Sequence, residues 1–119
     1  MPDTCTYTLD VRVTDAYTLQ EALDELSAAL HADLHPRSMR LNSSHIGEDH
    51  RIIQVADVMG ISKYGSPTLS DQALIPYPSV KIGPGDSARS HTPDEFIYLD
   101  EIGHGIDLYI QLLTKYINS

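Results

Sequence analysis

A segment with helical periodicity lies between two segments with strand periodicity, and this order constrains the fold more than any other feature of the chain. Residues 7–13 alternate apolar with polar side chains, which is the period of a half-buried strand. Thr18 stands three residues before Glu21, the spacing of a capping box, so a helix is predicted to begin there. A second short strand is predicted at 38–42. Residues 7–42 therefore predict a strand–helix–strand unit.

The remaining residues again alternate between helix and strand signals. A second helix is predicted from about His50 to Met59, ended by Gly60, and the longest helix from about Asp100 to Ile117. Segments 73–75 and 79–83 have strand composition, so the predicted fold class is α/β. Each half offers only two short strands, and an isolated two-stranded sheet is marginal in water. Both halves are therefore predicted to belong to larger sheets. The predicted buried face of the last helix is Ile102, Ile106, Tyr109, Ile110, Leu113, Tyr116 and Ile117.

Charge and composition exclude several classes of protein. The formal net charge is −9, from 17 acidic and 8 basic side chains, so nucleic acid is not a predicted partner. No apolar run reaches the roughly 18 residues needed to span a membrane. The segment 1–7 lacks the basic and apolar regions of a signal peptide, and the cytoplasm is the predicted compartment. Cys5 is the only cysteine, which excludes an intramolecular disulfide and a thiolate metal cluster.

The first candidate for chemistry is His91, in a Gly- and Ser-rich loop directly after a predicted strand. Such loops often carry functional residues because they are held by a rigid scaffold. Imidazole is also the commonest metal ligand, and Asp94 or Glu95 would be suited to orient it. Spacing alone leaves the alternative open that His91 is an ordinary exposed loop residue.

Three further motifs carry weaker signals. Loop 64–72 concentrates hydroxyls and a carboxylate, which suits either a polar ligand or an ordinary turn. His31 and Asp33 form a His-x-Asp pattern at the polar end of the first helix, and we interpret them as solvated surface. Segment 83–85, Gly-Pro-Gly, is followed by neither Lys-Ser/Thr nor a helix start, so it does not predict a phosphate cradle.

Segment 79–97, Ser-Val-Lys-Ile-Gly-Pro-Gly-Asp-Ser-Ala-Arg-Ser-His-Thr-Pro-Asp-Glu-Phe-Ile, resembles a C-terminal signature of the co-catalytic di-zinc deacylases and exopeptidases. This family includes acetylornithine deacetylase and succinyl-diaminopimelate desuccinylase, whose members end in a strand, a Gly-Pro-Gly turn, a His-x-x-Asp-Glu loop and a terminal helix. Pro-Thr-Leu-Ser-Asp at 67–71 is similar to the family's Gly-Thr-Ser-Asp substrate loop, with one extra residue. Leu-Asp-Val-Arg at 9–12 resembles its small dimerisation domain.

The resemblance implies a division into two parts. Residues 1–42 would be the C-terminal part of a ferredoxin-like dimerisation (lid) domain, and 43–119 the C-terminal helix–strand–helix part of the zinc-hydrolase catalytic domain. His91 would be a metal ligand that completes the second zinc site. The implied substrate-binding residues are Thr68, Ser70 and Asp71. The intact enzyme would be a homodimer that holds two zinc ions, or cobalt in their place.

The other functional residues of that family have no counterpart here. The chain contains no Glu-Glu pair to supply the catalytic base, and its only His-x-Asp is the surface pair already described. No catalytic residue is therefore assigned, and the chain is predicted to be a fragment that is inactive by itself. The implied activity of the intact enzyme is deacetylation of N-acetylornithine in arginine biosynthesis. The alternatives are N-succinyl-ornithine or succinyl-diaminopimelate as substrate, or a non-catalytic dimerisation or regulatory module.

Overall fold

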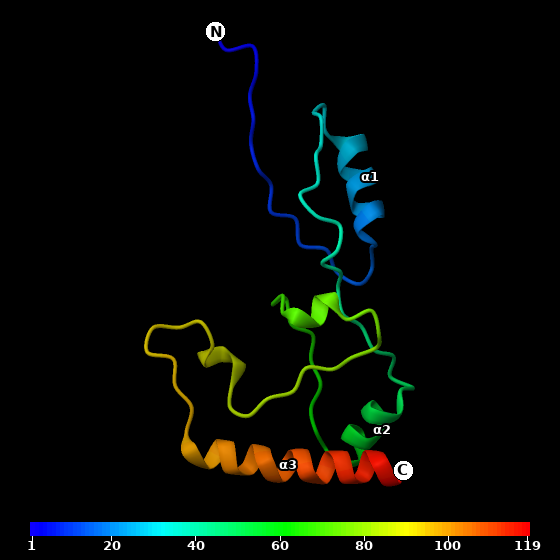
Figure 1. Cartoon of the computed structure of the whole chain (residues 1–119), viewed down its shortest axis with the longest axis vertical. Helices are drawn as coiled ribbons and strands as arrows, with labels where there is room; N and C mark the ends of the chain where they lie inside the picture. The colour runs from blue at the N-terminus through cyan, green and yellow to red at the C-terminus, as the bar shows by residue number, and fades with distance from the viewer. The chain divides into compact units, whose positions relative to one another are not determined.

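The computed structural model describes residues 1–119 and contains helices but no strand (Figure 1). The α-helices are α1 (Leu19–Ala29), α2 (Arg51–Val58) and α3 (Leu99–Asn118), and the 3-10 helices are η1 (Asp71–Leu74) and η2 (Ser87–Arg89). The chain divides into two units. Unit 1 comprises Met1–His45 and Leu69–Tyr77, and unit 2 comprises Ile46–Thr68 and Pro78–Ser119.

The predicted α/β fold is wrong, because none of the segments 7–13, 38–42, 73–75 and 79–83 forms a strand. Alternation in a sequence shows only which side chains would share a face. A strand also needs a neighbouring strand whose N–H and C=O groups complete the ladder, and the structure pairs none of these segments. The apolar side chains of 7–13 consequently remain in solvent, and Tyr7, Leu9 and Val11 are 57%, 51% and 48% exposed.

The start of α1 confirms the predicted capping box. The backbone N–H of Glu21 donates to the Thr18 hydroxyl at 3.1 Å, and the backbone N–H of Thr18 donates to the Glu21 carboxylate at 2.8 Å. Two of the N–H groups that a helix start leaves free are thereby satisfied. No residue of α1 is fully buried, and Ala73 in η1 is the one buried apolar residue of unit 1.

Unit 2 has a small core where α2 packs on α3. The imidazole of His50 accepts the N–H of Ile52 at 3.3 Å, and Gly60, with φ +69°, follows the helix end at Met59. The predicted bounds of α2 are therefore confirmed, and Gly60 has the left-handed conformation that a terminating glycine commonly adopts. The core contains Val55, Ala56 and Leu112, surrounded by the partly buried Ile52, Met59, Ile61 and Ile82.

Helix α3 has the predicted position but buries a different side. Gly105 and Leu112 are its buried residues, and Tyr109 and Tyr116 are partly covered. The other members of the predicted buried face are exposed: Ile102, Ile106, Ile110, Leu113 and Ile117. The apolar side of α3 is therefore broader than the surface that unit 2 provides to cover it.

Arg51 connects the first turn of α2 to the end of α3. Its guanidinium donates to the backbone carbonyls of Tyr116 and Ile117 and to the Ser119 hydroxyl, and it lies 5.0 Å from the centroid of the Tyr116 ring. The last carbonyls of a helix have no partner within the helix and carry partial negative charge. Arg51 satisfies two of them with a cation.

Much of the apolar surface of the chain stays in water. The accessible surface is 10140 Å², whereas two compact units that share its 13.2 kDa would expose roughly 7,700 Å² together. The excess corresponds to the many large apolar side chains that no element covers. None of the helices is both long and apolar enough to cross a membrane.

Candidate functional site

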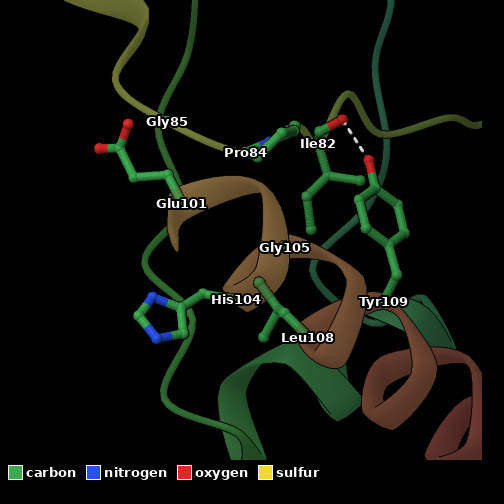
Figure 2. Close-up of a pocket in the computed structure, with 9 residues that line it drawn as sticks. Ile82, Pro84, Gly85, Glu101, His104, Gly105, Leu108 and Tyr109 are labelled. Atoms are coloured by element: carbon green, nitrogen blue, oxygen red, sulfur yellow. Dashed lines mark hydrogen bonds between the residues drawn. The ribbon is translucent and has the colours of Figure 1, made fainter. Parts of the chain in front are cut away.

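The Gly-Pro-Gly turn at 83–85 packs closely on the first half of α3 (Figure 2). A methyl group built on Gly105 would lie 2.8 Å from the Cβ of Pro84, so only glycine permits this approach. The hydroxyl of Tyr109 donates to the carbonyl of Ile82 at 2.6 Å. Gly85 has φ +82°, the left-handed region that favours glycine. Together these contacts fix the start of the loop that carries His91.

A cavity of about 260 Å³ lies between this turn and α3. Its polar groups include the carboxylate of Glu101 and the imidazole of His104, one turn apart on the helix (Figure 2). Glu101 already accepts bonds from Arg89 and from the backbone N–H of Tyr98, at 2.6 Å and 3.0 Å. A carboxylate committed in this way is a structural group, and a single further imidazole does not complete a metal site.

Arg89 joins the loop that carries His91 to the first turn of α3. Its guanidinium pairs with Glu101 and lies 5.0 Å and 5.4 Å from the ring centroids of Phe96 and Tyr98. The Phe96 and Tyr98 rings meet edge to face, with centroids 5.3 Å apart. One nitrogen of the guanidinium, Nη1, is buried without a hydrogen-bond partner. The loop is thus fastened to the first turn of α3 by an ion pair covered by two aromatic rings.

This ion pair shifts the pKa values of both Arg89 and Glu101. The hydrogen bond from Arg89, followed by the bond from the Tyr98 N–H, lowers the pKa of Glu101 below its ordinary value of 4.5. The hydrogen bond to Glu101 raises the pKa of Arg89 above its ordinary value. Glu101 is the member that titrates in the acid range. Because its folded pKa is lowered, its contribution to stability is present above pH 4.5 and is lost as the pH falls through the folded pKa.

We therefore expect Glu101→Gln to flatten the acid side of the stability profile. The thermal midpoint of the unsubstituted chain should fall between pH 5 and pH 3, whereas in the variant this fall should be smaller. Glu25→Gln is the matched control, because Glu25 is an exposed carboxylate of α1 outside every ion pair. Parallel profiles for the Glu101 variant and the unsubstituted chain would show that the ion pair contributes nothing to the acid sensitivity.

The backbone of the loop is unusual at His91 itself. His91 has φ +58° and Asp94 has φ +56°, and these are the only non-glycine residues with positive φ. Such conformations typically cost about 1–3 kcal/mol and occur where surrounding contacts hold them, often at functional sites. The contacts here are the His91 N–H to the Glu95 carboxylate at 3.1 Å and the Thr92 hydroxyl to the Arg89 carbonyl at 2.6 Å.

Glu95 therefore binds the backbone of His91 and not its ring. The sequence predicts that Asp94 or Glu95 orients the imidazole, and neither makes a hydrogen bond to it. His91 is exposed, and its imidazole makes no hydrogen bond. The assignment of His91 as a metal ligand stays a prediction.

The predicted substrate residues are divided between the two units. Thr68 belongs to unit 2, where its hydroxyl lies 2.7 Å from that of Ser66. Ser70 and Asp71 belong to unit 1: Ser70 is the residue before η1, its carbonyl accepts the N–H of Ala73 at 2.9 Å, and Asp71 is the first residue of η1. Their role in binding a substrate stays a prediction.

The residues present do not make a zinc site within this chain. No three His, Cys, Asp or Glu side chains are grouped so that they could hold a metal ion, and a protein zinc site needs at least three protein ligands. His31 lies just beyond the end of α1, is exposed, and is not joined to Asp33 by a hydrogen bond. His91 is therefore a single donor without neighbours able to complete a site.

Sequence reasoning missed Arg89 and Gly105, the two residues that hold the loop on α3. Arg89 was visible only as one basic residue in an otherwise polar run. The signal that would have identified it is a lone arginine followed within nine residues by two aromatic side chains and by Glu101 at the third position of a helix. Gly105 interrupts the apolar face of a long helix, which usually indicates close approach of another segment.

Comparison with known proteins gives one distant similarity. No model of a known protein family matches the chain. It is 28% identical over 113 aligned residues to the [LysW]-lysine hydrolase of Deinococcus radiodurans, and the match covers 87% of this chain and 31% of that protein. The chain thus spans about a third of the length of this curated relative. These residues are distantly related to a portion of a hydrolase.

Proposed function

We propose that this chain forms part of a zinc-dependent hydrolase that cleaves the amide bond between an acyl group and an amino acid. The observation that carries the proposal is the similarity to [LysW]-lysine hydrolase over 87% of the chain. The Gly-Pro-Gly turn and His-x-x-Asp-Glu loop of residues 83–95 give it independent support. The proposal is also supported by the position of that loop, which is held on the terminal helix by contacts of Pro84, Arg89 and Tyr109.

The first candidate substrate is N-acetylornithine, as in the acetylornithine deacetylases that residues 79–97 resemble. A second candidate is a lysine linked to LysW, because the relative is a [LysW]-lysine hydrolase. Ornithine and lysine differ by one methylene, which a pocket discriminates by only about 1–3 kcal/mol. The group joined to the amino acid, acetyl or LysW, therefore separates the two candidates better than the amino acid does.

In this proposal His91 supplies one imidazole donor to a zinc site whose other ligands come from outside these residues. Zinc, or cobalt in its place, would supply a Lewis acid for the attack on the amide carbonyl. Thr68, Ser70 and Asp71 would contribute hydroxyl and carboxylate groups to the substrate. The protein that works would be larger than these residues, in keeping with the length of the relative.

The test is a hybrid protein in which the matched portion of the D. radiodurans hydrolase is replaced by this chain. If the proposal holds, the hybrid hydrolyses an acylated diamino acid in the presence of Zn²⁺. Assays with N-acetylornithine, N-acetyl-lysine and a LysW-linked lysine distinguish the candidate substrates. A folded hybrid that binds zinc and hydrolyses none of the three would contradict the proposal.

For the chain alone we expect no measurable hydrolysis of N-acetylornithine with added Zn²⁺ or Co²⁺. The reason is that one imidazole does not hold a metal and that no three potential ligands are grouped. The measurement is acetate release at high protein concentration, with the hybrid as positive control. Activity that survives purification and disappears in His91→Ala would contradict this expectation.

A further inference from the structure

Residues 85–97 form an Ω-loop, a surface loop whose two ends lie close together. A methyl group built on Gly85 would lie 3.1 Å from the Cδ1 atom of Ile97, so the two ends of the loop pack on each other. Between residues 83 and 100, every residue except Arg89 is exposed. The loop therefore has no apolar core of its own, and Arg89 supplies the one side chain that its interior covers.

The guanidinium of Arg89 joins the first half of the Ω-loop to its end and to α3. It lies 5.0 Å and 5.4 Å from the ring centroids of Phe96 and Tyr98, and it donates to Glu101 at 2.6 Å. Arg89 precedes His91 in the chain and the two rings follow it, so these contacts close the intervening segment on itself. Fixing both ends of a segment limits the conformations open to the residues between them.

The backbone of His91 depends on this closure. His91 and Asp94 have φ values in the left-handed region, and such a conformation persists only where surrounding contacts hold it. The local contacts are the bond from the His91 N–H to Glu95 and the bond from the Thr92 hydroxyl to the Arg89 carbonyl. Both are exposed to solvent, where water competes for the same groups. The contacts of the Arg89 side chain, which is 18% exposed, are better shielded.

The Nη1 atom of Arg89 distinguishes positioning from simple stabilisation. It is buried without a hydrogen-bond partner, and an unpaired buried donor is costly. A lysine at this position would pair with Glu101 without burying a second nitrogen, but it would lack the flat guanidinium that covers both rings. The presence of arginine is therefore explained better by the shape it gives the loop than by the stability of the ion pair.

We propose that Arg89 is a positioning residue that acts through His91. Its guanidinium holds the Ω-loop closed, and the closed loop holds the His91 backbone in the conformation that presents the imidazole as a donor. The inference rests on the proposed function, in which His91 supplies one imidazole to a zinc site. Arg89 makes no hydrogen bond to the His91 ring, so its effect passes through the backbone of the loop.

The first test uses this chain alone. In NMR spectra, a residue with positive φ gives an unusually strong cross-peak between its own amide and α protons. The unsubstituted chain should show this signal at His91 and Asp94, and Arg89→Ala should reduce both signals to ordinary strength. Arg37→Ala is the matched control, since Arg37 is exposed and outside every ion pair. Ordinary signals in the unsubstituted chain, or strong ones in Arg89→Ala, would overturn the inference.

The second test measures the affinity of the hybrid hydrolase for Zn²⁺ by competition with a chelator. Arg89→Ala should weaken zinc binding about 10–100-fold, as is typical when a group that orients a metal ligand is lost. Combined with His91→Ala, it should weaken binding by less than about 2-fold more, because Arg89 acts through His91. Arg89→Lys keeps the charge but not the flat guanidinium, so its affinity should be intermediate. Arg37→Ala should leave zinc binding unchanged.

The outcomes separate this inference from the proposed function. Zinc binding that weakens in His91→Ala but not in Arg89→Ala would overturn the inference alone. Costs that add in the double variant would do the same, because they would mean that Arg89 stabilises the protein without acting through His91. If neither variant changes zinc binding, His91 is not a ligand, and its proposed role fails together with the inference. If Arg89→Ala does not fold, Arg89→Lys replaces it, and unchanged zinc binding in that variant would overturn the inference.

Discussion

Replacing His91 by Ala in the hybrid hydrolase is expected to lower both bound zinc and kcat/KM, the latter by about 100-fold or more. Mutating the groups that merely orient a metal ligand typically costs about 10–100-fold. The loss of a direct donor should therefore cost at least as much, because it leaves the metal with an open and misplaced coordination position. The measurement is zinc per subunit by elemental analysis, together with steady-state kinetics.

Three further variants separate this role from general damage to the loop. Ser70→Ala and Asp71→Asn should leave the zinc content unchanged and act mainly on KM, because we assign both residues to substrate binding. His31→Ala should change neither quantity, since His31 is an exposed residue just beyond α1. Full zinc occupancy and a near-normal rate in His91→Ala would mean that His91 is an ordinary exposed loop histidine.

The largest effect on folding is expected from Leu112→Ala. Leu112 is 5% exposed and packs with Val55 and Ala56 at the contact between α2 and α3. Truncation of a buried leucine costs about 2–5 kcal/mol, from lost transfer free energy and from the cavity left behind. Because the core of unit 2 is small, this is a large part of its stability. Urea unfolding followed by circular dichroism measures the change.

Leu113→Ala is the control for this experiment, because it makes the same substitution at the next residue, which is 49% exposed. The comparison should be made in dilute solution, where association of the chains does not contribute. Leu113→Ala should then cost less than about 1 kcal/mol, as is usual for surface positions. Equal costs for the two variants would indicate that Leu112 is not in the core, and that α3 packs on α2 by another side.

The features that the sequence predicted well are those that depend on a few neighbouring residues. The capping box at Thr18 and Glu21, the end of α2 at Gly60 and the extent of α3 are all set by hydrogen bonds or φ preferences within about one helical turn. Such signals act whether or not the rest of a fold is present. They were therefore readable without any knowledge of tertiary structure.

The features that failed depend on partners distant in sequence. Residues 7–13 and 79–83 have strand composition, but a strand requires a paired neighbour, and no periodicity within a segment supplies one. The buried side of α3 was misjudged for a related reason. Its isoleucines are the most apolar residues of the helix, yet Pro84 approaches at Gly105 and α2 packs at Leu112. Which side is covered was decided by segments far away in the chain.

The candidate site was located by its motif and not by its geometry. Residue identity marked His91 and its loop as a place for chemistry, and the structure adds left-handed backbone at His91 and Asp94 together with the Arg89–Glu101 ion pair. The left-handed backbone has no sequence signature of its own. Positive φ at a histidine is visible only in coordinates, and an ion pair between residues 12 apart depends on how the loop folds back.

The contact of Arg51 with the last carbonyls of α3 makes the stabilities of two distant segments interdependent. Fraying of the final turn of α3 would release the first turn of α2, and opening of α2 would expose those carbonyls. Helix ends usually open independently of the rest of a protein. Here the amide hydrogens of both segments should instead exchange with solvent in a single concerted opening. Residues at the end of the chain are in this way part of the same cooperative unit as residues near its middle.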